Sequence, residues 1–585
     1  MQVRAQRARA SVRDAASLPT MAGLKVPGPR SEPWGVHNWQ RLFPIAASRK
    51  ISLLTPEQAA RATENCGSDI RLDQVRSKLL RGDNVTIAAL GGSVSAASHG
   101  MSDMRANIPW SFHSQLAHAL RLWRPSRHSS SKSIVVHHNG AIPATGPAFF
   151  EHCLRAQMPA GRTDLVLVEF AVNMATEPAA AFERLLRQLL RMHSPPPAVV
   201  VVNVHHWQRS CPRGAPYTFR NPHCRWRDLQ SWNASTAEEA IAALCRHYDV
   251  PLVSMRAALF ANGSALTAQG ETLLTAAAYM GKEEGKKDSK IHPGPVGHTH
   301  LAQYVVSRVL CATPAARHCC EQQHRAHSQA AWTTHGHKAA DAEDAWHLPL
   351  PLLRHGREFA RGASICARGP ALGALVSSPT SGFAYTEEGR AKPGLVAHAA
   401  GSVLTFDLGN ESDACTDMHP PQYSRRRQRP QAVQAVDQRE LHWMGREEQK
   451  TQLTHAGAES CSFRTSVTLA HLLSYSPEMG RAQVRCFGQC QCQQVIVDAR
   501  THKRVSVTHL FPFEVQRNVS AHGEGGGCKL QLKVLPGRSS QSGCCKFKVI
   551  GLLVFPRAEG ERRIQASHHS LLHVTNSSAQ LELPF

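Results

Sequence analysis

The chain has 585 residues, which is more than a single hydrophobic core accommodates and indicates two or three domains. Its formal charge is +23 at pH 7, but aromatic residues make up only 6% of the chain and the basic residues gather in the amino-terminal tail and at 425–429. A nucleic-acid partner is therefore not expected, since such proteins concentrate basic and aromatic residues on one face. Attraction to an acidic polysaccharide, or solubility alone, explains the charge better. No run of about twenty apolar residues occurs, so we expect no transmembrane segment.

The first 45 residues form a basic segment for which we predict disorder. Between Met1 and Arg30, six Arg and Lys residues accompany a single acid, Asp14, and the apolar stretch of a secretory signal is missing. This composition resembles an organellar transit peptide more than a secretory signal.

Residues 46–312 alternate short apolar runs with helical patterns. The apolar runs are continuous, which is typical of parallel strands buried on both faces of a sheet. We therefore predict an α/β domain whose sheet is covered by helices on both sides. The expected strands are Val85–Leu90, Ser133–Val136, Leu165–Phe170, Ala198–Val204 and Pro251–Met255, and the main expected helices are 112–123, 179–193, 235–248 and 301–310.

Polar residues follow several of these strands. Gly91-Gly92-Ser93 follows the first expected strand, where glycine lets the backbone approach a substrate and the serine hydroxyl stands at the carboxyl edge of the sheet. Asn173 follows the third expected strand and so lies at the same edge, where ligands bind in such folds. His292 precedes the last helix. An imidazole can take the proton of a serine nucleophile, and an amide can donate to the oxyanion that then forms.

In order and spacing, these motifs, together with Asn139-Gly140 and the loop 143–146, resemble the four sequence blocks of the SGNH hydrolases, the GDSL esterase superfamily. They are most similar to the two-domain SGNH-like proteins of plants and algae. The resemblance implies a flavodoxin-like three-layer fold. It also implies a nucleophile, Ser93, and a general base, His292, with an oxyanion hole made by Asn173, the backbone at Gly92 and Ser93, and an N–H of the loop 144–146. Gly146 and Ala144 are alternative positions for this last donor.

Two positions depart from the family. The aspartate that usually stands three residues before the histidine is replaced by Ser289, and the nearest carboxylate is Asp288. Asp288 is therefore the candidate acid, and a Ser–His dyad oriented by a carbonyl group is the alternative. In the third block, Met174 occupies the position where the family has an aspartate that supports the asparagine.

The second half of the chain has a different pattern. Residues 313–346 are polar and without apolar periodicity, which indicates a linker. Residues 347–585 contain many short strand-like segments separated by turn residues, which predicts a β-sandwich-like domain. A segment near 415–455, rich in Arg and Gln, is expected to be a disordered insertion. The expected strands are 382–386, 394–397, 402–408, 466–473, 482–486, 494–498, 504–510, 529–534 and 547–555.

Eight of the 17 cysteines follow Ala414, a density that favours disulfides and therefore a secretory or extracellular location. This conflicts with the transit-like amino terminus, and the sequence leaves both locations open. A zinc site at Cys486, Cys490 and Cys492 is the alternative, although the paired spacing of a zinc site is missing.

The sequence thus predicts a serine esterase that deacylates a small-molecule or glycan ester without a metal or cofactor. Two alternatives stay open: a binding protein that kept the scaffold with little activity, and a sugar O-acyltransferase. The oligomeric state is not indicated.

Overall fold

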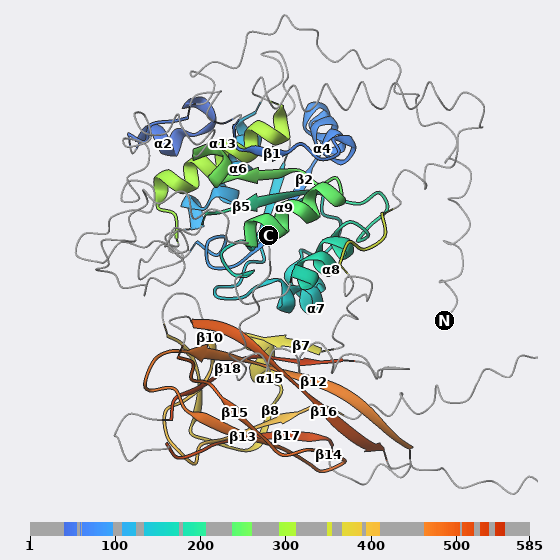
Figure 1. Ribbon diagram of the computed structural model, residues 1–585, viewed down its shortest axis with the longest axis vertical. Coiled ribbons are helices and arrows are strands. Elements are labelled where there is room, and N and C mark those ends of the chain that lie inside the picture. Colours follow the sequence, from blue (N-terminus) through green and yellow to red (C-terminus); the bar gives the residue numbers. More distant parts are fainter. Residues whose placement is uncertain are drawn as a thin grey trace, which may run out of the picture.

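The computed structural model of the protein contains an α/β domain followed by a β-rich domain, seen at the top and bottom of Figure 1. The described residues are 40–48, 50–54, 59, 61–97, 108–123, 134–174, 179–205, 237–259, 292–311, 348–353, 365–388, 393–409, 461–502, 506–519, 527–537 and 545–555. Asp288, most of the basic amino-terminal segment, the linker 313–346 and the insertion near 415–455 lie outside them.

The α/β domain has a six-stranded sheet with the order β1-β6-β5-β4-β2-β3. All neighbouring strands are parallel except β1, which pairs with β6 in the antiparallel direction. The nucleophile candidate thus follows β2, an inner strand between β4 and β3. The strands are β1 (Thr63–Asn65), β2 (Val85–Gly91), β3 (Val135–Asn139), β4 (Leu165–Glu169), β5 (Ala198–Asn203) and β6 (Leu252–Ser254).

Helices cover both faces of this sheet because its strands direct apolar side chains to both sides. In β4, Leu165 and Leu167 join one core cluster, whereas Val166 and Val168 join the other. The first core packs against α4 (Ile70–Arg81), α6 (Phe112–Leu122) and α13 (Pro295–Leu310), together with the short helices α2 (Pro44–Ser48) and α10 (Met255–Leu259). The second packs against α7 (Pro147–Gln157), α8 (Ala179–Leu189) and α9 (Ala237–His247). A 3₁₀ turn, η2 (Ile108–Trp110), precedes α6.

The β-rich domain consists of two packed antiparallel sheets. One has the order β14-β16-β12-β18-β10-β9, with β7 also paired to β18, and the other has the order β15-β13-β17-β11-β8. Their inner faces enclose a separate core. The elements are β7 (Ile365–Arg368), α15 (Pro370–Ala374), β8 (Val376–Ser381), β9 (Phe383–Glu387), β10 (Pro393–Ala397), β11 (Val403–Asp407), β12 (Cys461–Ser474), β13 (Arg481–Phe487), β14 (Cys490–Cys492), β15 (Val495–Asp498), β16 (Ser506–Val519), β17 (Lys529–Val534) and β18 (Phe547–Val554).

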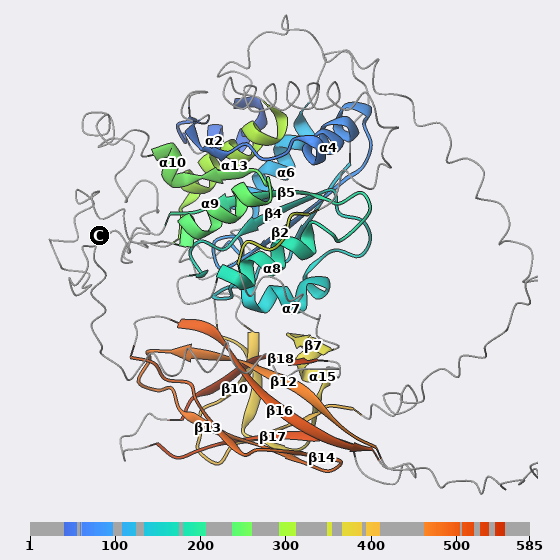
Figure 2. The same cartoon turned by 45° about the vertical axis from the view of Figure 1, so that its right-hand side comes forward.

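The two domains are joined through α7 and the outer face of the sheet that contains β18 (Figure 2). Every residue of β18 is buried, because one face packs inside the β-rich domain and Leu553 on the other joins the core beneath α7. A disulfide links Cys153 of α7 to Cys366 of β7. The Thr508 N–H donates to the Ala144 carbonyl at 2.8 Å, so a loop of the α/β domain is held directly by the β-rich domain.

The predicted fold class is confirmed: a three-layer α/β domain with a parallel central sheet and a β-sandwich-like domain after it. Leu42 and Phe43, which precede the expected domain boundary at residue 46, are buried in the core of the α/β domain. Disulfides Cys486–Cys492 and Cys490–Cys528 confirm the disulfide prediction, and the zinc alternative for these cysteines is wrong. Within the described residues, no helix combines the length and apolar character that crossing a membrane requires.

Candidate active site

The turn after β2 presents Ser93 beside two glycines that leave no room for a side chain. A Cβ atom on Gly91 would come within 2.4 Å of Ser95 Oγ, and one on Gly92 would come within 1.8 Å of Asn173 Oδ1. Both contacts are far below any real separation of such atoms. The glycines therefore allow the turn to fold back on itself and allow the Asn173 amide to lie against the backbone next to Ser93.

Ser93 and His292 lie within hydrogen-bond distance, with His292 Nε2 at 2.7 Å from Ser93 Oγ. Their positions differ by 199 in the sequence. His292 lies just before the first turn of α13, where Gly294 is the N-cap and Pro295 the first helical residue. A proline there has a backbone angle already suited to a helix, which fixes how the chain enters α13. The pair has the contact that an imidazole needs to remove the proton of a serine hydroxyl.

Asn173 is held in a tight turn at the end of β4. The N–H groups of Asn173 and Met174 both donate to the Phe170 carbonyl at 2.9 Å. The Asn173 side chain makes no hydrogen bond to any described residue, and its Oδ1 is buried without a partner. Its amide is thus positioned by packing on Gly92, with Nδ2 not engaged inside the described part of the protein.

The loop 142–146 runs beside the turn that carries Ser93. The Ile142 N–H donates to the Gly91 carbonyl at 2.9 Å, which ties the loop to the end of β2. Ala144 has φ +59°, a left-handed conformation that residues with a side chain rarely adopt and that often marks functional sites. Gly146 is the N-cap of α7 and has extended backbone angles. Neither the Ala144 N–H nor the Gly146 N–H donates to a described residue, so the two alternatives for the oxyanion donor remain.

A buried carboxyl group contacts the turn that carries Ser93. Glu169, the last residue of β4, accepts hydrogen bonds through Oε2 from the N–H of Ser95 at 3.3 Å and from its hydroxyl at 3.1 Å. Its backbone carbonyl accepts from the Gly92 N–H at 3.3 Å. Burial raises the pKa of Glu169 to about 8, although the hydrogen bonds from Ser95 and Gly92 act in the opposite direction. The same residue therefore fixes both ends of the turn that carries Ser93.

Two further side chains hold the Ser95 carbonyl. His113 Nε2 lies 2.6 Å from this oxygen and the Asn139 amide donates to it at 3.2 Å. Burial, together with a smaller effect of the neighbouring His137, lowers the pKa of His113 to about 3, so the ring is neutral at ordinary pH. With Nε2–H donating to Ser95, its Nδ1 accepts from His137 Nε2 at 2.8 Å.

The structure thus brings together Ser93, Gly92, Asn173 and His292, with Gly146 on the adjacent loop, whereas Asp288 is outside the described residues. Of the expected oxyanion-hole positions, Gly92 already uses its N–H in a hydrogen bond to the Glu169 carbonyl. Sequence reasoning missed Glu169 and His113, and it gave Asn139 no role. A signal for Glu169 was present: it is the only charged residue in the otherwise apolar strand 165–170. His113 carried no signal, because it is one of 34 histidines. Over the described ranges, no three His, Cys, Asp or Glu side chains group as a metal site requires.

Comparisons with known proteins were made at three levels. No family model matches the chain, and no curated protein matches it. Among solved structures, it is similar to a two-domain esterase (CEX) active on acetylated mannans, at 14% identity and a TM-score of 0.46, over 86% of this chain and 98% of that one. It is also similar to a catalytic mutant of Axe2, an acetylxylan esterase from Geobacillus stearothermophilus, at 14% identity and a TM-score of 0.26, over 39% of this chain and 95% of that one. At such values the likeness assigns no function.

The raised pKa of Glu169 makes stability depend on pH in a definite direction. The folded protein binds this proton more tightly than the unfolded chain, so the contribution is complete below the ordinary value of 4.5 and is lost as pH rises towards about 8. The free energy of unfolding should therefore fall between these values, by up to about 1.4 kcal/mol per pH unit from this group. Glu169→Gln should remove this part of the slope. The free energy of unfolding of both proteins is measured by denaturant titration at several pH values from 5 to 8. If it falls equally steeply with pH in the wild type and in Glu169→Gln, the prediction is wrong.

Proposed function

We propose that this protein is a serine esterase that removes an acyl group from a small-molecule or glycan ester. The observation that carries the proposal is the 2.7 Å contact between Ser93 Oγ and His292 Nε2 at the carboxyl edge of the parallel sheet. A serine and a histidine in this contact are common to many hydrolases that form an acyl-enzyme. The unengaged donors around Ser93 add a second requirement of that chemistry, since they offer hydrogen bonds to an oxyanion.

In the proposed reaction, Ser93 Oγ attacks the ester carbonyl carbon while His292 Nε2 takes the hydroxyl proton. The tetrahedral intermediate carries a negative oxygen, which accepts from the Ser93 N–H, the Asn173 amide and an N–H of the loop 144–146. The C–O bond to the alcohol then breaks, and His292 returns the proton to the departing oxygen. Water, deprotonated by His292, attacks the acyl-enzyme, releasing a carboxylic acid and restoring the Ser93 hydroxyl.

The surrounding residues support this reaction by keeping the oxyanion donors in place before the substrate arrives. Donors that are already oriented need no reorganisation in the transition state, and one such donor is worth about 10²–10³ in kcat. Glu169 and His113 are positioning residues, because their side chains hydrogen-bond to Ser95 and not to Ser93. The Asn173 amide depends on packing against Gly92, since Met174 offers no polar support.

A weakly active binding protein is the second candidate. It is favoured by Ser289 at the usual position of the acid and by the unpartnered Oδ1 of Asn173, both of which reduce the support of the catalytic groups. An O-acyltransferase would use the same acyl-enzyme with a sugar hydroxyl in place of water, and products formed with and without a sugar acceptor separate it from a hydrolase.

The nucleophile is tested by hydrolysis of 4-nitrophenyl acetate and of an acetylated glycan. Ser93→Ala should lower kcat by at least about 10³, because no other hydroxyl takes the place of the nucleophile. Ser462→Ala, an exposed serine of the β-rich domain, is the matched control and should keep full activity. Equal rates in the wild type and Ser93→Ala would exclude the proposed mechanism, and absence of activity in every form would favour the binding protein.

We propose Asp288 as the acid that orients His292. If it has this role, Asp288→Asn should lower kcat by up to about 10⁴, because the imidazole would lose the partner that selects its tautomer. Glu284→Gln removes a charge from the same acidic and basic stretch and serves as the control. The comparison of kcat on 4-nitrophenyl acetate decides between the triad and the dyad: if both variants retain wild-type rates, a Ser–His dyad operates.

A further inference from the structure

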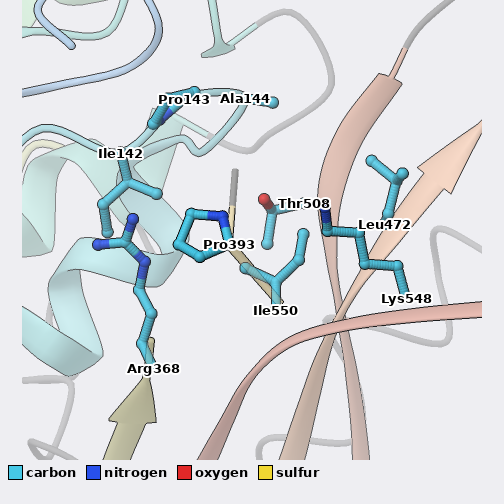
Figure 3. A pocket seen from close by; sticks show the side chains of 9 residues that line it. All are labelled: Ile142, Pro143, Ala144, Arg368, Pro393, Leu472, Thr508, Lys548 and Ile550. Carbon is cyan, nitrogen blue, oxygen red and sulfur yellow. The ribbon is translucent and has the colours of Figure 1, made fainter. Parts of the chain in front are cut away.

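A cleft lies where the loop next to the nucleophile turn meets the β-rich domain (Figure 3). Ile142 and Ala144 form its wall on the catalytic side, and the opposite wall contains Arg368, Leu472, Thr508 and Lys548. Its empty volume is about 340 Å³, including the space open to solvent.

Arg368 is an uncompensated cation in this cleft. It belongs to β7, and its guanidinium extends towards Ile142. Its Nε is buried and has no hydrogen-bond partner, and no ion pair involves it within the described residues. Burial lowers the pKa of Arg368 to about 10, which still leaves the side chain charged at neutral pH. A partly buried cation whose Nε has no partner is costly, so a site of this kind fits an anion that arrives from outside the chain.

Lys548, which also lines the cleft, is paired with the carboxylate Glu388, and Lys546 shares this carboxylate. Glu388 accepts from Lys548 Nζ at 2.8 Å and pairs with Lys546 Nζ at 2.7 Å. Burial alone would raise the pKa of Glu388, but the hydrogen bonds from these lysines outweigh it and lower the pKa, so this carboxylate is ionised. Lys546 is also paired with Glu478, so three basic side chains, Arg368, Lys546 and Lys548, accompany two carboxylates, and the group keeps one excess positive charge.

The cleft is connected to the candidate active site through one short loop. Ile142 is hydrogen-bonded to Gly91, two residues before Ser93, and Ala144 is one of the two candidates for the oxyanion donor. The same Ala144 accepts from Thr508 of the far wall, and Thr145 Oγ1 lies 3.0 Å from Thr508 Oγ1. The loop 142–144 therefore borders both the candidate active site and the cleft that contains Arg368.

We infer that this cleft binds the anionic group of an acidic glycan, a carboxylate or a sulfate, through Arg368, and so selects acidic glycan esters over neutral ones. The inference rests on the proposed function, since it names the substrate class of that site. Arg368 would donate two hydrogen bonds to the anion, a geometry that guanidinium and carboxylate or sulfate groups share. Lys548 would add a second positive charge on the same wall.

Binding is measured by calorimetry on the Ser93→Ala protein, so that ester cleavage does not interfere. The probes are oligogalacturonate, a sulfated galactan oligosaccharide and neutral mannopentaose. We expect at least one anionic probe to bind about ten times more tightly than mannopentaose, which corresponds to one charge-assisted hydrogen bond. Preference for oligogalacturonate indicates a carboxylate ligand, and preference for the galactan indicates a sulfate. Added NaCl should weaken the binding of the anionic probe more than that of mannopentaose.

Arg368→Gln should abolish the preference for the anionic probe, and Arg368→Lys should keep part of it as a single point charge. Arg464→Gln is the matched control, because it removes the same charge from an exposed position of the same domain and should leave the preference unchanged. Circular dichroism checks that each variant is folded. If Arg368→Gln does not fold, the inference is tested by two other results: a reduced preference in Arg368→Lys, and weaker binding of the anionic probe to the Ser93→Ala protein in added NaCl. The absence of both would overturn it.

The inference is overturned if neither anionic probe is preferred, if Arg368→Gln retains the preference, or if inorganic sulfate binds but no glycan does. These outcomes are separate from a failure of the esterase proposal. An inactive wild-type protein whose Arg368-dependent binding persists would contradict the esterase and keep the anion site, whereas an active protein without preference would do the reverse.

Discussion

The contact between Ser93 and His292 depends on the parallel sheet that puts distant segments at one edge. Ser93 follows β2, Asn173 follows β4, and His292 enters the helix that covers one face of the same sheet. Because β2 and β4 are direct neighbours, the two turns that follow them pack against each other, and Gly92 allows the closest approach. No local feature of the chain could produce this arrangement, so the site requires the folded sheet as a whole.

This edge is held by buried polar groups, which are costly unless they are paired. Glu169 and His113 are completely enclosed, and burial disfavours the charged form of each. Both direct their hydrogen bonds to Ser95, two residues after Ser93. The protein thus places neutral polar contacts next to the turn that carries Ser93, whereas the Asn173 amide has no hydrogen-bond partner among the described residues. A site that binds an oxyanion gains from this division, since the support is fixed while the donors stay available.

Much of the fold could be predicted from the sequence, because strands buried on both faces have continuous apolar runs. Val85–Gly91, Leu165–Glu169 and Ala198–Asn203 differ from the expected strands by one residue at most. The antiparallel strands β12 and β16 are longer than expected because residues such as Ser462, Arg464 and Glu514 face solvent and interrupt the apolar pattern.

Most contacts between distant segments could not be predicted from the sequence. It could indicate that Ser93, Asn173 and His292 share an edge, since strand ends of a parallel sheet lie together. It could not pair Cys153 with Cys366, or direct Arg368 at the loop 142–144, because these contacts depend on how the two domains dock. The docking of the two domains buries the outer face of β18. In the sequence, this burial is indicated by the apolar run 547–555.

The central claim is that His292 activates Ser93, and covalent labelling tests it most directly. The protein is treated with a fluorophosphonate, which bonds to an activated serine, and the modified residue is found by peptide mass spectrometry. The account predicts one label, on Ser93, and its loss in a folded His292→Gln variant. A label on a different serine, or labelling of Ser93 at the same rate without His292, would contradict it.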